Sequence, residues 1–520
     1  MDLRWWFDRA AEQPDSNGGV IAGAPGLRGL RVARDQWRQA AEDMAAHAGR
    51  LLALWASRDD HGEHLVRAAF MADARVLVLT LAVRESDGAY PGIEALFPGA
   101  SRMQRAVADL YGLRAGGADT RRWLRHAAWP EDFHPLIDAA APASAAAPAL
   151  ENYPFVAVAG DGVHEIPVGP IHAGIIEPGH FRFSVVGEKV LRLEERLGYV
   201  HKGIERRFTE MALLDGQRLA ARVSGDSAVA YSWSYCQALE GMAGARAPAR
   251  AAALRALALE LERLANHLGD LGAIGNDAGF AFGLAQFSRL KEGLLRATEQ
   301  ALGQRYLMDF IVPGGTRVDL HPEPAASLAQ CVDAIRLETD GLRTIYDEHA
   351  GLRARFTGAG VVTPALAVKL GLIGLAGRAS GQAFDLRCDM PCEPYGGLRP
   401  EKAARSQGDV AARVAVRFDE AAESARMLQQ LLRHMPAGAH CAQIPVPNPG
   451  DRGIGLIEGW RGPVLVALEA GGGGMIGRCH PHDPSWLNWP VIEHAIIDNI
   501  VPDFPLINKS FNLSYSGHDL

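Results

Sequence analysis

A run of small, uncharged residues divides this chain into two parts. Residues 139–150 read Ala-Ala-Ala-Pro-Ala-Ser-Ala-Ala-Ala-Pro-Ala-Leu. They offer no charge and no large apolar side chain before the final leucine, so nothing anchors them to a packed core. The sequence therefore predicts a small domain over residues 1–138, an extended linker over 139–150 and a large domain over 151–520.

The composition is that of a folded globular protein, with 48% hydrophobic and 22% charged residues among 520, which excludes general disorder. A net charge of -8 without a block of basic residues gives no footprint for nucleic acid. The most apolar stretches, such as Val361–Ala376, are interrupted and shorter than the roughly 20 residues of a membrane span. The N-terminus lacks the apolar segment of a secretion signal. We therefore expect a cytoplasmic chain that meets a membrane only through partners.

The cysteines are few and scattered. Of the 6 cysteines, only Cys388 and Cys392 lie near each other. This pair could hold a metal, but no second pair stands at zinc-finger spacing, and no spacing is typical of an iron–sulfur cluster. In a reducing compartment we expect buried thiols, no bound metal and no disulfides.

The small domain is predicted to be α/β. Residues Arg75–Val83 are aliphatic and β-branched, as in a strand, and helical spacing surrounds them. Tyr90–Ala100, a helix-like segment ending at Asp109–Leu113, and Pro130–Leu136 follow in that order. This order resembles the small peripheral-arm subunit of respiratory complex I, over about residues 60–137, and implies a docking role without catalysis. Residues 1–59 match no motif.

The large domain begins with short predicted strands and then becomes helical. The strands are predicted at Val156–Val158, Phe181–Val186 and Lys189–Leu193. Three segments repeat apolar residues every three or four positions, as core helices do: Leu254–Gly269, Ala325–Ala350 and Asp409–Arg433. The predicted fold class is α+β, with an N-terminal α/β domain followed by a mainly helical bundle and a small antiparallel sheet.

Several blocks of the large domain resemble the large subunit of membrane-bound nickel–iron hydrogenases and the quinone-site subunit of complex I. These blocks are Gly169–Arg182, Leu197–Arg206, Glu260–Leu264, Gly377–Asp389, Gly408–Arg417 and Ile457–Gly462. A complex I-type small domain is often fused ahead of such a subunit. The resemblance covers most of residues 60–520 and implies a hydrogenase-like fold.

The four cysteines that hold nickel and iron in the hydrogenases are missing here. The matching positions hold Ser224, Ser227, Ser514 and Gly517. Such a centre needs soft, anionic thiolates, which a neutral hydroxyl or a glycine does not replace. The resemblance therefore implies a hydrogenase frame without the nickel–iron centre and no cofactor bound directly.

Candidate catalytic residues lie in two of these blocks and in the segment that carries Ser224 and Ser227. His172, on a Gly/Pro-rich loop, has the chemistry of a proton donor to a reduced acceptor, although such a histidine is by itself usually just exposed. Arg461 matches the arginine that overhangs the hydrogenase metal and would orient an acceptor. Gly225 stands where the complex I subunit has its quinone-binding tyrosine, so Ser224, Asp226 and Ser227 are left to offer a hydroxyl or a carboxylate.

Three further features are structural candidates. Glu205 matches a carboxylate that helps to bind a structural magnesium in hydrogenases, whereas without the resemblance it would be half of a surface pair with Arg206. His267 is predicted to be a satisfied core histidine. The buried Arg and Asp residues of 377–389 and 408–417 are either pairs around a cavity or structural ion pairs.

The resemblance identifies the chain as a subunit of a complex I-like or hydrogenase-4-like oxidoreductase, peripheral on the inner face of the cell membrane. It implies a complex that binds NAD, with electrons derived from NADH or ferredoxin. The electrons would pass to quinone or another acceptor, and their transfer would be coupled to ion translocation. The implied partners are a small subunit with an iron–sulfur cluster, a ferredoxin-like subunit and antiporter-like membrane subunits.

Two other hypotheses remain. In the first, the chain is a non-catalytic coupling subunit whose old cavity is packed shut by apolar side chains. An open polar cavity near His172, Ser224 and Arg461 would favour the enzyme instead. The second is an active hydrogenase with serine ligands, which predicts stoichiometric nickel.

Overall fold

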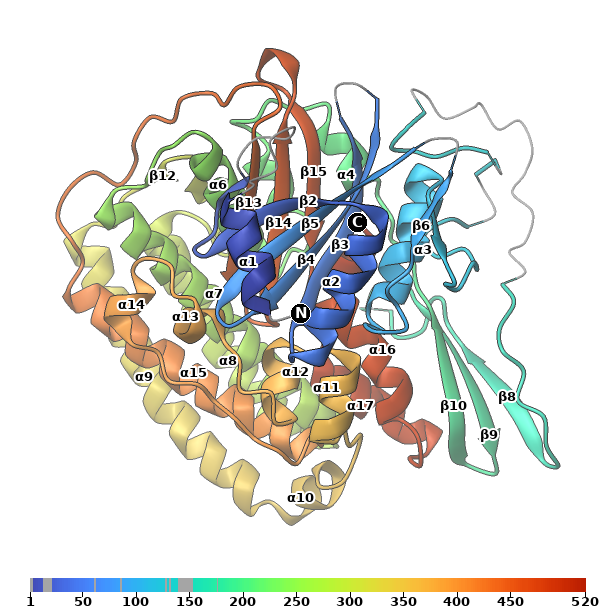
Figure 1. Ribbon diagram of the computed structural model, residues 1–520. Coiled ribbons are helices and arrows are strands. Elements are labelled where there is room, and N and C mark those ends of the chain that lie inside the picture. Colours follow the sequence, from blue (N-terminus) through green and yellow to red (C-terminus); the bar gives the residue numbers. More distant parts are fainter. Residues whose placement is uncertain are drawn as a thin grey trace.

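The computed structural model describes residues 3–12, 21–59, 62–84, 87–126, 129–130, 132–138, 153–174 and 176–520 (Figure 1). The predicted linker at 139–150 lies outside these residues. No helix in the described part of the chain is long and apolar enough to cross a membrane.

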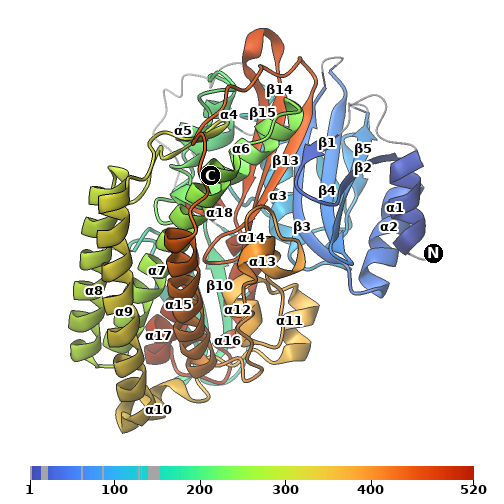
Figure 2. The same cartoon turned by 90° about the vertical axis from the view of Figure 1, so that its left-hand side faces the viewer.

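A four-stranded sheet forms the centre of the N-terminal domain, in the order β2-β5-β4-β3. The strands are β2 (Leu27–Val32), β3 (Arg50–Arg58), β4 (His64–Ala72) and β5 (Arg75–Val83). The strand predicted at 75–83 is confirmed as β5, whose aliphatic run suits a position with neighbours on both sides. Helices α1 (Leu3–Glu12) and α2 (Arg34–Ala46) lie on the outer side of this sheet (Figure 2), and α3 (Ala100–Tyr111) contacts β3.

A second sheet joins the two ends of the chain. Its strands are β13 (Arg452–Glu458), β14 (Pro463–Ala470) and β15 (Ile476–His482), and β1 (Ile21–Gly23) pairs in parallel with β13. Glycine is required at Gly23, because a Cβ atom there would lie 2.1 Å from the carbonyl oxygen of Ile454. In Figure 2 this sheet lies between the N-terminal domain and the long helices.

Long helices form the rest of the large domain. They are α6 (Ala228–Met242), α7 (Ala249–Asp277), α8 (Ala281–Leu302), α9 (Pro322–Glu348) and α15 (Val410–Arg433). The three predicted helices are confirmed as α7, α9 and α15. Helix α7 packs between α8 and α15 and is buried along most of its length, so it delivers polar side chains to the interior.

A three-stranded antiparallel sheet extends from the body of the molecule (Figure 1). It contains β8 (Val163–Val168), β9 (His180–Val186) and β10 (Lys189–Arg196), so two predicted strands are confirmed. The strand predicted at Val156–Val158 is wrong. The backbone N–H of Val156 donates to Glu194 Oε2 at 2.9 Å, so a side chain takes the place of a strand partner. The fold class is α+β, as predicted.

Candidate functional site

The structure brings two of the substituted cysteine positions into contact. Ser224 lies in the turn before α6, and Ser514 precedes the short helix α18 (Tyr515–Asp519). Their Oγ atoms are 2.9 Å apart. Both line a cavity of about 680 Å³ between α7, the α6 turn, the β13–β14 turn and the C-terminal segment.

The local structure explains why serine suits these positions. The Ser514 Oγ accepts a hydrogen bond from the backbone N–H of Gly517 at 2.8 Å and so caps α18, a role that serine fills well. Ser227 stands at the N-cap position of α6. The Ser514 hydroxyl therefore has a structural task besides any contact with a ligand, whereas the Ser227 side chain makes no capping hydrogen bond.

The main charged group of the cavity is an ion pair between Arg461 and Asp226. The two guanidinium nitrogens lie 2.7 and 2.5 Å from the two carboxylate oxygens, and Arg461 Nε donates to the Asn512 carbonyl at 2.6 Å. Ser224 and Ser227 also donate to Asp226, at 2.9 and 3.4 Å. Burial opposes ionisation, but Arg461 nevertheless lowers the pKa of Asp226 to about 2. The candidate residues Ser224, Asp226, Ser227 and Arg461 thus form one cluster.

A second acid on the cavity wall was not among the residues predicted from sequence. Asp270, on α7, accepts from Arg417 Nε at 2.9 Å and from Asn512 Nδ2 at 2.7 Å. Lys509 Nζ lies 3.6 Å from it. Arg417 belongs to the block 408–417, so at least this buried arginine acts next to the cavity.

The four positions do not fit a nickel–thiolate centre. A Cβ atom at Gly517 would lie 2.5 Å from Asp483 Oδ2, so Asp483 occupies the space of a side chain there. Tyr231 Oη donates to the same carboxylate oxygen at 2.8 Å. The remaining donors are hydroxyls, which are hard and neutral ligands.

The predicted proton donor, His172, is not among the residues that line the cavity. Its ring lies against Phe181 and Tyr515, with centroids 5.6 and 6.4 Å away, and burial lowers its pKa. Tyr515 stands between His172 and the cavity wall. Glu177, from the same loop, lines the cavity and accepts from the backbone N–H of Ser516 at 3.0 Å. The sequence pointed to His172 as the side chain of this loop that faces the cavity, whereas Glu177 is the one that lines it.

Glu205 is buried in a structural ion pair. It lies on α4 (Ile204–Phe208), and its Oε1 accepts from Arg478 Nη2 at 2.6 Å and lies 2.7 Å from His480 Nδ1. Arg206 instead donates to the carbonyls of Pro135 and Asp138. The surface pair between Glu205 and Arg206 is therefore absent, and a guanidinium stands beside the carboxylate that the resemblance linked to magnesium.

An apolar pocket of about 320 Å³ adjoins the cavity. The two share Gly225, Asp226, Asn266 and Lys291 in their walls. The pocket also exposes Glu262, which accepts from the backbone N–H of Val229 at 2.7 Å. Burial raises the pKa of Glu262 to about 8.

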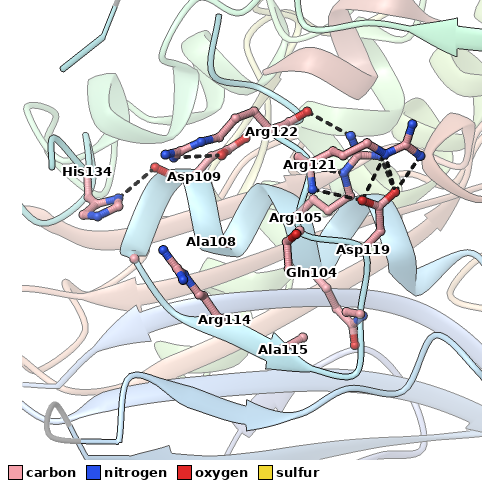
Figure 3. Close-up of a pocket in the computed structure, with 13 residues that line it drawn as sticks. Gln104, Arg105, Ala108, Asp109, Arg114, Ala115, Asp119, Arg121, Arg122 and His134 are labelled. Atoms are coloured by element: carbon pink, nitrogen blue, oxygen red, sulfur yellow. Dashed lines mark hydrogen bonds and ion pairs between the residues drawn. The ribbon is translucent and has the colours of Figure 1, made fainter. Parts of the chain in front are cut away.

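A third pocket, of about 270 Å³, lies in the N-terminal domain beside α3 (Figure 3). It holds none of the candidate residues. Asp109 Oδ2 accepts three backbone N–H groups at residues 123–125, and Arg105 donates to the carbonyls of Arg121 and Arg122. Arg121 pairs with Asp119 at 2.7 Å. These contacts hold the loop after β7 (Arg114–Gly116) onto α3.

The remaining predictions from sequence concern a possible metal site, the cysteines and the core histidine His267. No group of three or more potential metal ligands occurs among the described residues. Cys388 donates to the carbonyl of Pro400, and each of the 6 cysteines is a free thiol. His267 is fully buried, with Nε2 3.0 Å from Glu420 Oε2, which confirms it as a core histidine, although its Nδ1 has no hydrogen-bond partner in the part of the chain that the structure describes.

Comparison with known proteins identifies both halves. The family model of the respiratory-chain NADH dehydrogenase 49 kDa subunit matches residues 277–452, and that of the 30 kDa subunit matches residues 30–143. Formate hydrogenlyase subunit 5 of Escherichia coli is 32% identical over 437 residues, which cover 83% of this chain and 77% of the relative. The chain belongs to the family of the complex I 49 kDa subunit and the related hydrogenase large subunits.

Two further relatives support this assignment. The C/D subunit of the NADH-quinone oxidoreductase of Bacteroides thetaiotaomicron is 26% identical over 410 residues, covering 75% of this chain and 77% of the relative. A chain of the archaeal membrane-bound sulfane sulfur reductase matches with a TM-score of 0.65 and 24% identity, covering 69% of this chain and 99% of that one. The latter supports the fold alone. The 30 kDa match begins at residue 30, earlier than the sequence motifs indicated.

Proposed function

We propose that this chain is the acceptor-reducing subunit of a membrane-bound, complex I-like oxidoreductase that works without a nickel–iron centre. Electrons derived from NADH or ferredoxin reach the cavity from an iron–sulfur cluster in a neighbouring subunit. Quinone is the first candidate acceptor, and the transfer is coupled to ion translocation. Relatives named as formate hydrogenlyase, hydrogenase-4 and NADH-quinone oxidoreductase subunits support this assignment.

The open, polar cavity is the observation that carries the proposal. Hydroxyls of Ser224 and Ser514 lie on one wall, and the ammonium groups of Lys291 and Lys509 supply further donors. A pocket with a few convergent polar groups is typical of a binding site. A developing negative charge on a reduced acceptor is stabilised by such preorganised donors, with Arg461 held in place by Asp226.

Protons for the reduced acceptor have two sources in the loop 169–182. Glu177 faces the cavity directly, and His172 lies behind the ring of Tyr515. An imidazole and a carboxyl group both serve as general acids when they are within reach of the acceptor. In this proposal Glu177 delivers the proton to the acceptor and His172 acts one step further out.

The non-catalytic coupling subunit is the second candidate. It requires an apolar plug in the cavity, and the polar lining does not supply one. Its support is that the Ser224 and Ser514 hydroxyls and the Arg461–Asp226 pair already have partners within the protein. The hydrogenase with serine ligands has the least support, because the donor set at the four positions does not fit nickel.

The partners in this proposal are an iron–sulfur small subunit, a ferredoxin-like subunit and antiporter-like membrane subunits. The chain itself binds no cluster and sits on the inner face of the membrane through these partners. The name of one relative, a membrane-bound hydrogenase subunit of Pyrococcus furiosus, supports such an assembly.

The decisive experiment is purification of the intact complex, followed by metal analysis and a quinone-reduction assay on the same preparation. The proposal expects iron without nickel, together with quinone turnover. Iron without nickel and no turnover with quinone or other acceptors would favour the coupling subunit. Stoichiometric nickel would restore the hydrogenase hypothesis and contradict ours.

A further inference from the structure

A buried network of charged side chains lies behind the turn that carries Arg461. It contains four carboxyl groups and three guanidinium groups, and every one of these side chains is at most 2% exposed. The members are Glu260, Asp385, Glu420, Glu458, Arg263, Arg378 and Arg387. They come from α7, β13, α12 (Gly374–Ala379), α15 and α13 (Leu386–Asp389) with its N-cap. If every carboxyl group were ionised, the network would bury one uncompensated negative charge.

An uncompensated charge in a protein interior costs several kcal/mol, and a buried acid therefore usually takes up a proton instead. The network is thus expected to hold one extra proton. The candidates are the four carboxyl groups and His267, the histidine that contacts Glu420. Their hydrogen-bond partners distinguish among them.

His267 is best satisfied as a neutral ring. Its Nε2 lies 3.0 Å from Glu420 Oε2, whereas its Nδ1 is buried without a hydrogen-bond partner. A charged imidazolium would also stand near the guanidinium groups of Arg263 and Arg417, which oppose a positive charge on the ring. Burial also lowers the pKa of this histidine.

Three of the four carboxyl groups are well compensated as anions. Glu260 accepts from Arg387 Nη1 with both oxygens at 3.1 Å and also from two hydroxyl groups. Asp385 accepts from Arg387 Nη2 at 2.7 Å and from its Nε. Glu420 accepts from Arg378 Nε at 2.6 Å and contacts His267.

Glu458 has the weakest compensation. Its Oε1 accepts from Arg378 Nη1 at 2.8 Å, and its Oε2 accepts from the backbone N–H of Leu386 at 3.1 Å. The same Nη1 atom also donates to the carbonyl of Phe384 and lies 3.8 Å from Asp385. Arg263 Nη2, the next nearest cation, donates to the backbone carbonyl of Glu458 at 2.5 Å.

We propose that Glu458 is a buried protonation site, which carries the extra proton of this network and keeps it electrically neutral in the folded protein. The pKa of Glu458 agrees with this assignment. Burial, together with the nearby Asp385, raises the pKa of Glu458 to about 7 against the opposing effect of Arg378 and Arg263.

The position of Glu458 connects this proton to the cavity. Glu458 ends β13, and the turn after it carries Trp460 and Arg461. The Trp460 ring lies between the Arg461 guanidinium, 4.0 Å from its centroid, and His267, at 6.2 Å. Glu458 stands only three positions before Arg461 in the chain, so a neutral Glu458 opposes negative charge near Arg461 less than an ionised one does. This use of the proton rests on the proposed function, whereas the protonation itself does not.

Infrared difference spectroscopy on the full-length chain, with any subunits that copurify, tests the protonation directly. Wild type minus Glu458→Gln at pH 6 is expected to contain the C=O stretch of a protonated carboxyl group. The matched control is Glu292→Gln, which removes an exposed carboxyl whose pKa is lowered to about 2 by Arg305 and Arg296. A difference spectrum for Glu458→Gln that lacks this band, like that of the control, would overturn the proposal.

Stability against pH gives a second readout. A folded-state pKa near 7, above the ordinary value of 4.5, means that the folded protein binds one more proton than the unfolded chain between these pH values. Stability from this group is therefore full below pH 4.5 and is lost as the pH rises to 7. In Glu458→Gln, the slope of the free energy of unfolding against pH between 4.5 and 7 is expected to change by the equivalent of one proton. An unchanged slope would contradict the proposal.

A measurement without that variant covers the case in which Glu458→Gln does not fold. Glu262→Gln serves as the background, because Glu262 also has a raised pKa. The amplitude of the protonated-carboxyl band in this variant is expected to decrease as the pH is raised from 6 to 8, because Glu458 then loses its proton. A band of constant amplitude would overturn the proposal, and neither outcome depends on the identity of the acceptor.

Discussion

Single side chains decide whether the cavity is a reaction site. Arg461 contacts both Asp226 and the C-terminal segment, so it can hold an acceptor against the two serines. Arg461→Ala is expected to lower acceptor turnover by about 100-fold or more, the usual effect of removing a preorganised donor, while the subunits still copurify. The measurement is turnover of the purified complex.

Arg461→Lys is the matched control for this prediction. It keeps the charge but loses the two-pronged contact with Asp226, so intermediate turnover is expected. Normal turnover in Arg461→Ala would count against a catalytic cavity and favour the coupling subunit.

Gly517 lies where a side chain would have no room. Because a Cβ atom would lie 2.5 Å from Asp483 Oδ2, Gly517→Ala is expected to lower the free energy of unfolding by about 1–3 kcal/mol, as overpacking does. Thermal or denaturant unfolding of the full chain measures this change. Gly341→Ala is the control, because nothing lies near that helical position, and it should leave stability unchanged or slightly raised.

At the scale of elements, a buried ion pair connects a short helix to a sheet. Glu205 connects α4 to β15 through Arg478. Glu205→Gln leaves that guanidinium buried without its carboxylate, which costs about 3–5 kcal/mol. Denaturant unfolding at neutral pH checks this value. Glu338→Gln, in an exposed pair with Arg289, should change stability by only about 0–1 kcal/mol, and an equal loss in both variants would refute the prediction.

The elements also show what the sequence can and cannot indicate. Strand β5 and helices α7, α9 and α15 were predictable, because their apolar patterns are local properties of the chain. Strand β1 was not, since its three residues gain their structure by pairing with β13 near the other end of the chain. In the cavity, motif order indicated Ser224 and Arg461. Asp270 and Glu177 were missed, because the direction of a side chain on a helix or loop depends on tertiary packing.

At the scale of the whole molecule, the described parts of the two halves pack against each other. Strand β1 extends the sheet of β13, Arg67 on β4 pairs with Glu469 on β14 at 2.7 Å, and Arg102 contacts Glu493 at 2.8 Å. These contacts are largely buried, and such pairs are costly to separate. The linker is therefore not what holds the halves together.

A protease site inserted within residues 139–150 tests this conclusion. After cleavage, the fragments 1–138 and 151–520 are expected to elute together in size-exclusion chromatography, because the shared sheet and the interface remain. Combining the cut with Gly23→Val, whose side chain would strike the backbone of Ile454, should weaken the association by breaking the β1–β13 pairing. Fragments that separate after cleavage alone would show that the interface is too weak to hold the halves together.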